Sequence, residues 1–381
     1  MKIEISGLGS ALPQGSLTQA DAATTAHRWR RFEDSATADR QLQLLSALYR
    51  RSGVQTRHSV LLDEGTELAV DRQSFYGAAS TAEDRGPTTA ARMDRYASEA
   101  PMLAERACRV ALDQAGVDAA SISDLVTVSC SGFNSPGFDL ALFPQLGLSP
   151  RTSRTHVGFM GCHGALNGLR VARALATANP SARVLLCAVE LCTLHHQYTD
   201  EPQQIVANSL FADGAAAAVI QCSQKENGRS AGNGEHPEAR AAWQIVDSGS
   251  YLVPDSDQSM TWRIGDHGFC MTLSAQVPEM IQSQLRDWLI PWLAGHGLTL
   301  AAVSNWAVHP GGPRILKATA EALALPGDAL ATSLSVLSEC GNMSSPTILF
   351  ILERLLQTRS AGPCVALAFG PGLVVEATLL R

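Results

Sequence analysis

The pattern that most constrains the fold of this chain is an alternation of short apolar runs with longer segments of helical apolar spacing. The short runs predict buried strands at residues 122–129, 155–159, 183–189, 303–308, 365–369 and 374–379, after an opening strand at 1–6. The helical spacing predicts helices at residues 165–178, 277–293, 315–325 and 345–356. Because strands that alternate with helices form sheets covered on both faces, we expect an α/β fold with a mainly parallel sheet.

A polar segment rich in glycine and asparagine, residues 224–238, divides this alternation into two parts. We therefore expect two α/β halves, residues 1–223 and 239–381, joined by a linker. The pattern leaves open whether the halves are related by symmetry. A second polar stretch, residues 74–89, predicts a surface loop before a helix that starts near Asp94.

Composition and charge restrict the class of protein. Hydrophobic residues make up 45% of the chain and charged residues 17%, which suits a globular protein with an extensive core. A net charge of -7 argues against nucleic-acid binding, although a local basic patch for phosphates stays compatible with it. The start lacks the regions of a secretory signal, and no apolar run is long enough to span a bilayer. The nine cysteines show no C-x-x-C spacing, and a reducing compartment fits them best. We therefore expect a cytoplasmic protein, without stable membrane insertion.

One cysteine lies where a predicted strand turns into a predicted helix. Cys162 follows Gly161 and precedes the helix expected at residues 165–178. The N-terminus of a helix carries partial positive charge, which favours the thiolate and hence a nucleophilic cysteine. A cysteine between apolar residues is also commonly an inert core residue, so this position alone leaves both interpretations open.

Two polar side chains occupy comparable boundaries between elements. His309 ends the predicted strand at 303–308 and precedes the Gly/Pro loop 310–313, where functional groups converge in parallel sheets. Asn342 lies in the Gly- and Ser-rich turn 341–346, just before a predicted helix. A histidine bonded to backbone groups and an asparagine that caps a helix are the structural alternatives.

The combination of Cys162, His309 and Asn342 predicts a chemistry that none of the three predicts alone. A thiolate takes an acyl group, an imidazole supports the thiolate and donates to an oxyanion, and a neutral amide supplies a second donor. A carboxylate in place of the amide would repel the enolate that a decarboxylation forms. We therefore expect an acyl-transferring site.

The motifs around these residues resemble those of the type III polyketide synthases, the family of chalcone and stilbene synthases and their bacterial relatives. The matching segments, in the family's order, are Gly161-Cys162, FADGAA at 211–216, HPGGP at 309–313, GNMSS at 341–345 and FGPG at 369–372. The resemblance implies a thiolase-like fold with five αβαβα layers and a homodimer. It also implies acyl-CoA and malonyl-CoA as substrates, with no metal or redox cofactor. Cys162 would be the nucleophile, and His309 with Asn342 would form the decarboxylation and oxyanion site.

The resemblance also assigns residues to the substrate cavity: Phe211, Met271, Cys130, Trp262, Gly370, Pro371 and Gly372. Phe211 matches a gatekeeper between the coenzyme A tunnel and the cavity. Met271 stands at a second gatekeeper position, where plant enzymes have phenylalanine and where a thioether would make a softer gate. Trp262 falls near a cavity position that is small in the plant enzymes. Ordinary core packing is the alternative for both gate residues.

A basic segment, residues 50–57, resembles the part of relatives that holds the phosphates of coenzyme A. Arg51 and Arg57 would bind phosphate through their forked donors, with Gly311 and Gly312 also at the coenzyme A site. A solvated basic helix end is the alternative.

The altered gate predicts a fatty acyl starter and an alkylresorcinol or alkylpyrone product, with malonyl-primed tetrahydroxynaphthalene synthesis as the alternative. Three other classes need to be weighed. An initiating ketoacyl-acyl-carrier-protein synthase has other His and Asn motifs. A cysteine protease shares the order Cys, His, Asn, but the papain-type signature does not surround Cys162. A non-catalytic protein of the same fold would not need all three residues.

Overall fold

The structure, a computed structural model, describes residues 1–30, 35–65, 67–81, 83–223, 242–358 and 362–381. The strands are β1 (Ile3–Ala11), β2 (Ser16–Thr18), β3 (Thr56–His58), β4 (Asp124–Ser129), β5 (Ser153–Gly158), β6 (Arg183–Leu191), β7 (Asp213–Cys222), β8 (Trp243–Leu252), β9 (Met260–Gly265), β10 (Gly268–Leu273), β11 (Asn305–Val308), β12 (Cys364–Gly370) and β13 (Val374–Leu380). The helices are α1 (Gln19–Arg28), α2 (Ser35–Arg51), α3 (Thr89–Ala115), α4 (Phe138–Leu146), α5 (Gly164–Ala178), α6 (Pro202–Leu210), α7 (Val277–Ala294), α8 (Pro313–Leu323), α9 (Ala331–Cys340) and α10 (Thr347–Gln357). The linker predicted at 224–238 lies outside the described residues.

A nine-stranded sheet runs through the molecule in the order β11-β12-β13-β8-β1-β7-β6-β4-β5. Its β5 end comes from the first half of the chain and its β11 end from the second half. The two halves meet where β1 pairs with β8, with Ile3 opposite Ile245 and Ile5 opposite Trp243.

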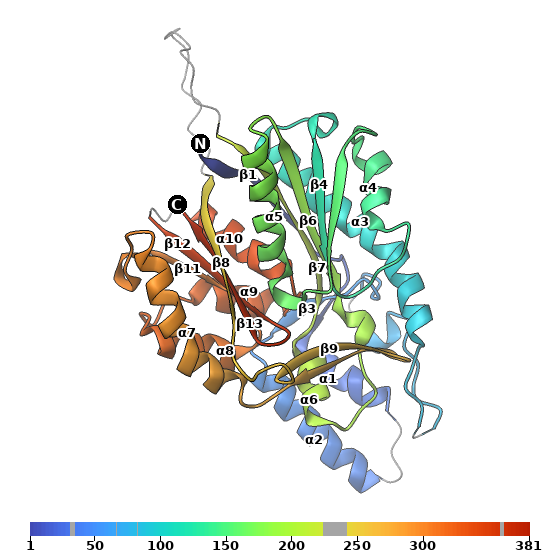
Figure 1. The fold of residues 1–381 in the computed structure, drawn as a ribbon. Coiled ribbons are helices and arrows are strands. Elements are labelled where there is room, and N and C mark those ends of the chain that lie inside the picture. The colour runs from blue at the N-terminus through green and yellow to red at the C-terminus, as the bar shows by residue number, and fades with distance from the viewer. Residues whose placement is uncertain (31–34, 66, 82, 224–241, 359–361) are drawn as a thin grey trace.

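Helices cover both faces of this sheet and form the five layers that the resemblance implies (Figure 1). Side chains of α3 and α4 pack on one face of β4, β6 and β7, and those of α5 and α10 pack in the middle of the molecule. Side chains of α7 and α8 pack on the outer face of β11, β12 and β13. The five layers are therefore α3 with α4, the β4–β6–β7 part of the sheet, α5 with α10, the β11–β12–β13 part of the same sheet, and α7 with α8.

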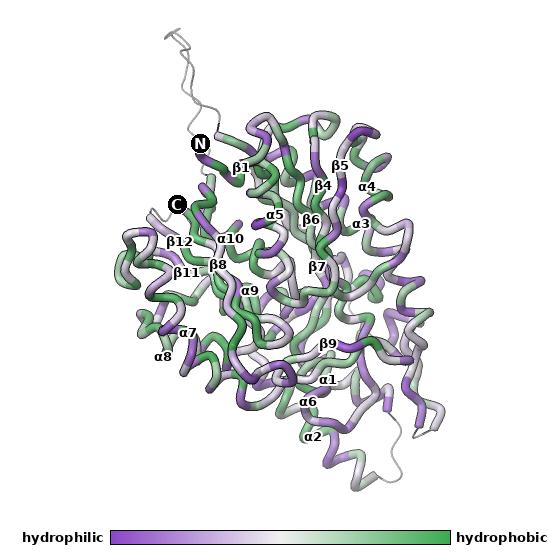
Figure 2. Tube along the Cα trace, viewed as in Figure 1, coloured by the Kyte–Doolittle hydropathy of each residue, from purple (hydrophilic) through white to green (hydrophobic). Residues whose placement is uncertain are grey.

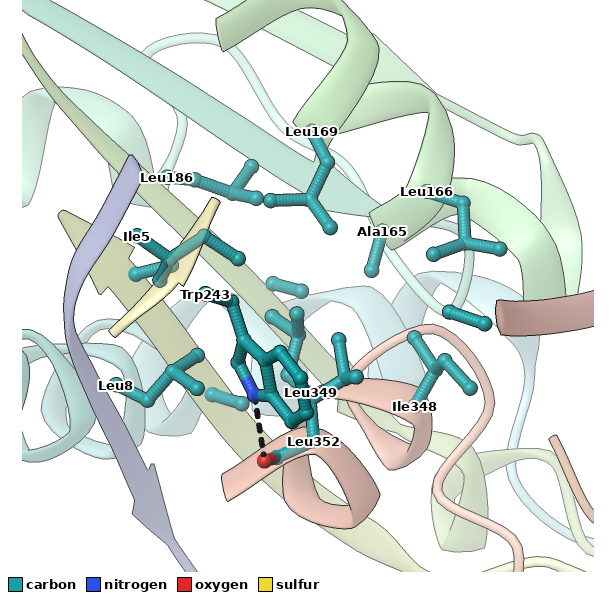
Figure 3. Close-up of a cluster of buried hydrophobic side chains, with 14 of the residues drawn as sticks. Ile5, Leu8, Ala165, Leu166, Leu169, Leu186, Trp243, Ile348, Leu349 and Leu352 are labelled. Carbon is teal, nitrogen blue, oxygen red and sulfur yellow. Dashed lines mark hydrogen bonds between the residues drawn. The ribbon is translucent and has the colours of Figure 1, made fainter. Parts of the chain in front are cut away.

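The central layer is a hydrophobic core centred on Trp243 (Figure 3). The indole Nε1 donates to the carbonyl of Leu352 at 3.1 Å, and the ring is 3% exposed. Leu169 of α5 and Ile348 of α10 are fully buried in the same cluster. Burial of each such side chain contributes about 2 kcal/mol, so this layer holds the two halves together. Figure 2 shows the hydrophobic residues gathered along the central strands, with hydrophilic ones toward the periphery.

Most predicted elements are confirmed, with bounds shifted by a few residues. The expectation of a mainly parallel sheet was wrong. β4 is parallel to β5 and β6, and β11 is parallel to β12, but β1, β7, β8 and β13 pair antiparallel with their neighbours. The connection from β12 to β13 is only the turn 371–373, which is too short for the crossover that parallel pairing needs.

The predicted surface loop at 74–89 is confirmed in part. Most of its described residues are exposed or half-buried, but Tyr76 is 3% exposed. The following helix α3 begins at Thr89, not near Asp94, because the Thr88 side chain caps it by accepting from the Ala91 N–H. Among the described helices, none has both the length and the apolar character that crossing a bilayer would need.

Candidate active site

The local backbone places Cys162 at the end of a strand and the start of a helix, as predicted. β5 ends at Gly158, a short 3-10 helix spans Gly161–His163, and α5 begins at Gly164. Gly161 has a φ of 73°, and a Cβ atom there would collide with the ring of Pro371. A glycine is therefore required immediately before the cysteine, for both its backbone angle and its lack of a side chain.

The thiol of Cys162 is buried, with 8% of the residue exposed. Burial raises the pKa of the Cys162 thiol to about 11, and the carboxyl group of Glu190 also raises it. Hydrogen bonds with Ser344 and Asn342 act in the opposite direction. Burial therefore opposes the thiolate that the N-terminus of a helix favours.

His309 follows β11 and is anchored by its backbone, whose N–H donates to the carbonyl of Leu367 at 2.8 Å. The residue is fully buried, and neither ring nitrogen has a partner among the described residues. Burial, with a contribution from the neighbouring imidazole of His163, lowers the pKa of His309 to about 3. The imidazole of His309 is thus neutral, and both of its ring nitrogens are available to hydrogen-bond a ligand.

Asn342 follows α9, where Gly341 takes a φ of 74°. The backbone N–H of Asn342 donates to the carbonyl of Leu210 at 2.9 Å, and the Ala212 N–H donates to the carbonyl of Asn342 at 3.0 Å. The side-chain Oδ1 accepts from the backbone N–H of Ser344 at 2.8 Å. Because its oxygen is engaged, the carboxamide presents its Nδ2 hydrogens as donors.

Cys162 and Asn342 line one small apolar cavity of about 20 Å³. Its other wall residues are Ala207, Leu210, Phe211, Met260, Met271, Leu273, Gly311, Ile315 and Phe369. The structure thus brings Phe211, Met271 and Gly311 beside the cysteine, as the resemblance implies. His309 is not one of the residues that line this cavity, but its carbonyl accepts from the N–H of Gly311, which is, at 3.0 Å.

The loop Gly370-Pro371-Gly372 is not among the residues that line this cavity, and its part in substrate binding stays a prediction. Pro371 packs under Gly161, and Gly370 lies against the ring of His163. The N–H of Gly372 donates to the carbonyl of Met260 at 3.0 Å. The loop supports the cysteine from behind, because its glycines permit a close approach that a side chain would block.

A second compartment of about 80 Å³ lies on the other side of Phe211. Trp262 lines it, together with Cys192, His195 and Phe269, and so do apolar residues of the N-terminal region such as Ala22 and Leu61. Sequence reasoning missed His195, which stacks on Phe269 with ring centroids 4.1 Å apart. Its position four residues after the buried Leu191, in an apolar run, gave no sign of a cavity role.

Cys130 is 4% exposed and lines neither compartment. It acts instead through its backbone and its neighbours. Its carbonyl accepts from the Trp262 Nε1 at 2.8 Å, and its Sγ lies 3.4 Å from the Ser344 Oγ. Its N–H donates to the buried carboxylate of Glu190, which Ser345 also contacts at 2.6 Å. The carbonyl of Cys130 thus fixes the indole of Trp262, which lines the second compartment. The thiol of Cys130 itself lines neither compartment.

The predicted contact of Arg57 with coenzyme A phosphate was wrong. Arg57 is 5% exposed, and its guanidinium donates to the carbonyls of Asn208 at 2.7 Å, Ser209 at 2.6 Å and Phe211 at 3.0 Å. Burial lowers the pKa of Arg57. The guanidinium also donates to the side-chain oxygen of Gln19. Arg57 thus ties α1 to the end of α6 next to Phe211, and both of its terminal nitrogens are occupied by protein acceptors.

Arg51, by contrast, is exposed at the mouth of a groove of about 380 Å³ that reaches toward the cavity. Gly311 and Gly312 line the groove, and Leu210, Leu273 and Ile315 line both the groove and the cavity. Arg314, which sequence reasoning missed, is exposed on the same groove. Its position directly after the Gly/Pro loop 310–313 could have indicated that Arg314 lies near the coenzyme A site predicted at Gly311 and Gly312.

This fold and site define an acyl-transferring condensing enzyme of thiolase-like architecture. Residues 2–224 match the N-terminal domain of the chalcone and stilbene synthases, and residues 244–381 match the C-terminal domain. The chain belongs to the chalcone and stilbene synthase family, the type III polyketide synthases, which are enzymes that catalyse decarboxylative Claisen condensations.

Individual relatives support the same assignment. "Alpha-pyrone synthesis polyketide synthase-like Pks18" of Mycobacterium tuberculosis is 30% identical, over 98% of this chain and 90% of its own. A 1,3,6,8-tetrahydroxynaphthalene synthase of Streptomyces peucetius is 34% identical, over 90% of this chain and 84% of its own. Among solved structures, PKS-I of the brown alga Ectocarpus siliculosus superposes with a TM-score of 0.88 at 29% identity, covering 100% of this chain and 98% of that one.

Proposed function

We propose that this protein loads an acyl group from an acyl-CoA starter onto Cys162 and extends it with malonyl-CoA, then cyclises the chain. The observation that carries the proposal is the buried cavity shared by the Cys162 thiol and the Asn342 carboxamide, with a groove behind it that bears two arginines.

Loading begins with a thiol and a neutral imidazole. His309 takes the proton of the Cys162 thiol, the thiolate attacks the thioester carbonyl, and the proton passes to the departing thiolate of coenzyme A. In extension, malonyl-CoA loses carbon dioxide and leaves an enolate, whose oxygen receives hydrogen bonds from His309 and Asn342. The enolate carbon attacks the acyl thioester, and the Cys162 thiolate leaves. No step in this cycle needs a metal or a redox cofactor.

Coenzyme A is the proposed carrier of both substrates. Arg51 at the end of α2 and Arg314 in the first turn of α8 both line the groove, where guanidinium groups suit phosphate. Gly311 and Gly312 leave part of the groove wall without side chains. The pantetheine arm would then run past Leu210 to the cysteine.

An alkylpyrone or alkylresorcinol is the proposed product class, and the compartment behind Phe211 is the proposed place for the starter's acyl tail. Its wall includes apolar side chains such as Leu17, Ala22 and Leu61, which an alkyl chain would contact favourably. The alpha-pyrone relative supports this choice. Malonyl-primed tetrahydroxynaphthalene synthesis is the second candidate, because the Streptomyces relative has that name and both compartments are small.

We further propose a homodimer that forms along β5. This strand ends the nine-stranded sheet, and five of its six residues are exposed. Phe133, Phe159 and Met160 beside it are 49%, 37% and 39% exposed, which is unusual for large apolar side chains. A second copy would cover this apolar edge. All nine cysteines are free, which supports the proposal of a reducing compartment such as the cytoplasm.

The deciding experiment supplies the purified protein with malonyl-CoA or with malonyl-carrier protein, each with a panel of acyl-CoA starters. We expect carbon dioxide release and polyketide products with malonyl-CoA alone. Turnover only with malonyl-carrier protein would instead identify an initiating ketoacyl synthase, and no release with either donor would support a non-catalytic protein. Peptide cleavage lost on Cys162→Ala would revive the protease.

A further inference from the structure

The wall of the compartment behind Phe211 is rich in hydrogen-bond donors and poor in acceptors. Tryptophan, tyrosine, arginine and histidine side chains all contribute to it, and among the described residues that line it none is an aspartate or a glutamate. Donors in a buried wall need acceptors, which the protein, water or a ligand must supply. The partners of these donors therefore show whether the wall is complete without a ligand.

Some polar side chains of this wall are satisfied by the protein itself. Gln73 donates to the carbonyl of Tyr76 at 2.8 Å and accepts from its backbone N–H at 2.7 Å. His195 uses both ring nitrogens, because Nε2 lies 2.6 Å from the carbonyl of Ser131 and Nδ1 accepts from the N–H of Phe269 at 3.0 Å. These side chains fix the wall, and their polar atoms are engaged within it.

Two neighbouring side chains of the same wall, Trp29 and His196, differ from these. The Trp29 Nε1 is buried and has no hydrogen-bond partner in the part of the chain that the structure describes. His196 is engaged through its backbone, whose carbonyl accepts from Arg92 at 2.9 Å, but its ring nitrogens have no partner among the described residues. The two rings pack edge to face, with centroids 4.9 Å apart and an interplanar angle of 77°. Two unused polar groups thus lie side by side in one wall.

The surroundings of His196 determine which ligand the pair fits. Burial, followed by the positive charges of Arg92, Arg57 and Arg30, lowers the pKa of His196 to about 3. A neutral imidazole has one N–H donor and one acceptor nitrogen, and the indole N–H is a donor only. A hydroxyl oxygen can therefore accept from Trp29 while its hydrogen bonds His196, and a carboxylate can accept from both rings. The nearby arginines favour such an electron-rich oxygen.

A second pair of unpaired polar groups lies in the same wall. The Tyr49 hydroxyl and the Arg57 Nε each lack a hydrogen-bond partner among the described residues. The guanidinium carbon of Arg57 lies 5.6 Å from the centroid of the Tyr49 ring, so the two side chains adjoin. The excess of donors is thus a property of the compartment and not of one side chain.

Trp29 and His196 lie beyond the gate as seen from the nucleophile. Phe211 lines both the cavity of Cys162 and the compartment, whereas Trp29 and His196 line only the compartment. From Ala22 to Trp29 the wall follows α1 for about 10 Å. Because the carbonyl end of an acyl group is bound to the Cys162 sulfur, only the far end of a chain that passes Phe211 can meet this pair.

We propose that the compartment selects an acyl starter whose far end carries an oxygen, as a hydroxyl or a carboxylate, and that Trp29 and His196 bind this oxygen. The inference rests on the proposed function and narrows its substrate class. Loading forms the thioester with Cys162 and releases the coenzyme A thiol as described above, and the far end stays unchanged. A methyl-ended chain would leave both polar groups unpaired.

The test measures competition between starters for Cys162 without malonyl-CoA, so that the keto oxygens of a growing chain cannot contribute. Hexanoyl-CoA, ω-hydroxyhexanoyl-CoA and adipoyl-CoA differ only in the far end, and a matching set of ten-carbon chains tests the reach. Mass spectrometry of the Cys162 peptide gives the ratio of adducts. We expect a hydroxyl-ended or a carboxylate-ended starter to exceed the methyl-ended one roughly 10-fold or more in at least one set, because a site built for a polar group rejects an analogue that lacks it.

Trp29→Phe and His196→Phe keep an aromatic ring and remove its polar atoms. Each should lower the preference several-fold by slowing the oxygen-ended starter more than the methyl-ended one. Tyr198→Phe is the matched control, because the Tyr198 ring packs 6.3 Å from that of Trp29 but does not line the compartment, so the wild-type preference should remain. Equal loading of all three ends at both lengths, or a preference that survives both substitutions in folded protein, would overturn the proposal and leave water as the occupant of the pair.

Isothermal titration calorimetry of Cys162→Ala with the same thioesters separates this inference from the proposed function. It reads the preference for the far end without any chemistry, and the oxygen-ended thioester should bind more tightly. That result in a protein whose wild type releases no carbon dioxide from malonyl-CoA would refute the function and keep the selectivity. Carbon dioxide release by the wild type, with no discrimination between the far ends, would refute this inference alone.

Discussion

The backbone N–H of Ser344 donates to the side-chain Oδ1 of Asn342 at 2.8 Å, which fixes the carboxamide with its NH₂ group toward the cavity of Cys162. This bond decides what Asn342 offers an enolate. With the oxygen engaged, only the nitrogen can reach a ligand, so the side chain acts as a donor.

Asn342→Asp should therefore abolish the donor while keeping the size and the bond from Ser344. Malonyl-CoA decarboxylation should fall by about 10²-fold to 10³-fold, the range found when one oxyanion donor is removed, because a carboxylate also repels the enolate. Measurement of carbon dioxide release in single-turnover experiments checks this. Asn342→Gln is the control, since it keeps the amide but displaces it; decarboxylation by Asn342→Asp at the wild-type rate would contradict the role.

Trp262 limits the space around Phe211, and its indole is held by the Cys130 carbonyl at 2.8 Å. Trp262→Ala should enlarge the compartment and shift products toward longer starters or more extensions. It should also lower the free energy of unfolding by about 2 kcal/mol, less than for a fully buried tryptophan. Trp262→Phe is the matched control, because it keeps a ring and loses only the hydrogen bond. Identical product profiles in all three proteins would rule out Trp262 as a wall of the acyl site.

Two arginines on the groove should bind coenzyme A, and a third nearby should not. Arg51→Ala and Arg314→Ala should each raise the KM for malonyl-CoA several-fold with little change in kcat, and more strongly at low ionic strength. Arg50→Ala is the matched control, since Arg50 is also exposed near the end of α2 but does not line the groove.

Arg57→Leu should have a different effect. It leaves the carbonyls of Asn208, Ser209 and Phe211 without their donor, so it should destabilise the protein by about 3 kcal/mol. Urea unfolding measures this. An Arg57→Leu protein of normal stability with a raised KM for malonyl-CoA would instead assign coenzyme A binding, and no structural role, to Arg57.

The pKa values of the site predict how the free enzyme responds to pH. Burial raises the pKa of Cys162 to about 11, so alkylation by iodoacetamide should accelerate as the pH rises toward that value. Burial also lowers the pKa of His309 to about 3, so the folded state resists protonation of a group that the unfolded chain protonates near its usual pKa of about 6.5. Stability is therefore present above pH 6.5 and is lost as the pH falls toward 3. His309→Gln should reduce this loss of stability at acid pH, as measured by thermal unfolding. For Cys162, an alkylation rate that levels off near pH 7 would contradict the raised pKa of the buried thiol.

Some of the site could be predicted from sequence because its backbone constraints are local. Cys162 and Asn342 each follow a glycine with a φ near 74°, so the motifs marked the turns before any contact was known. Arg51 and Arg57 could not be told apart in this way. Arg57 lies on β3, where it faces inward opposite Leu17 of β2, whereas Arg51 ends α2 on its exposed side. Strand pairing between segments far apart in the chain decides which arginine meets solvent.

The fold was predictable at the level of elements and less so in their directions. The strands β5, after α4, and β12, after α10, pair in parallel with β4 and β11 as expected. The strands β1 and β7 pair antiparallel across most of the N-terminal half, and no local pattern indicates that pairing. The compartment behind Phe211 was also beyond sequence reasoning, because residues between Leu17 and Phe269 assemble it.

The central claim is that Cys162 carries the growing chain, and mass spectrometry of the intact and digested protein tests it most directly. The wild-type protein should be incubated briefly with an acyl-CoA starter and malonyl-CoA, beside Cys162→Ala and, as a matched control, Cys130→Ala. We predict acyl and ketoacyl adducts on the peptide that contains Cys162 in the wild type and in Cys130→Ala, and none in Cys162→Ala. Adducts on another cysteine that persist in Cys162→Ala would contradict the account.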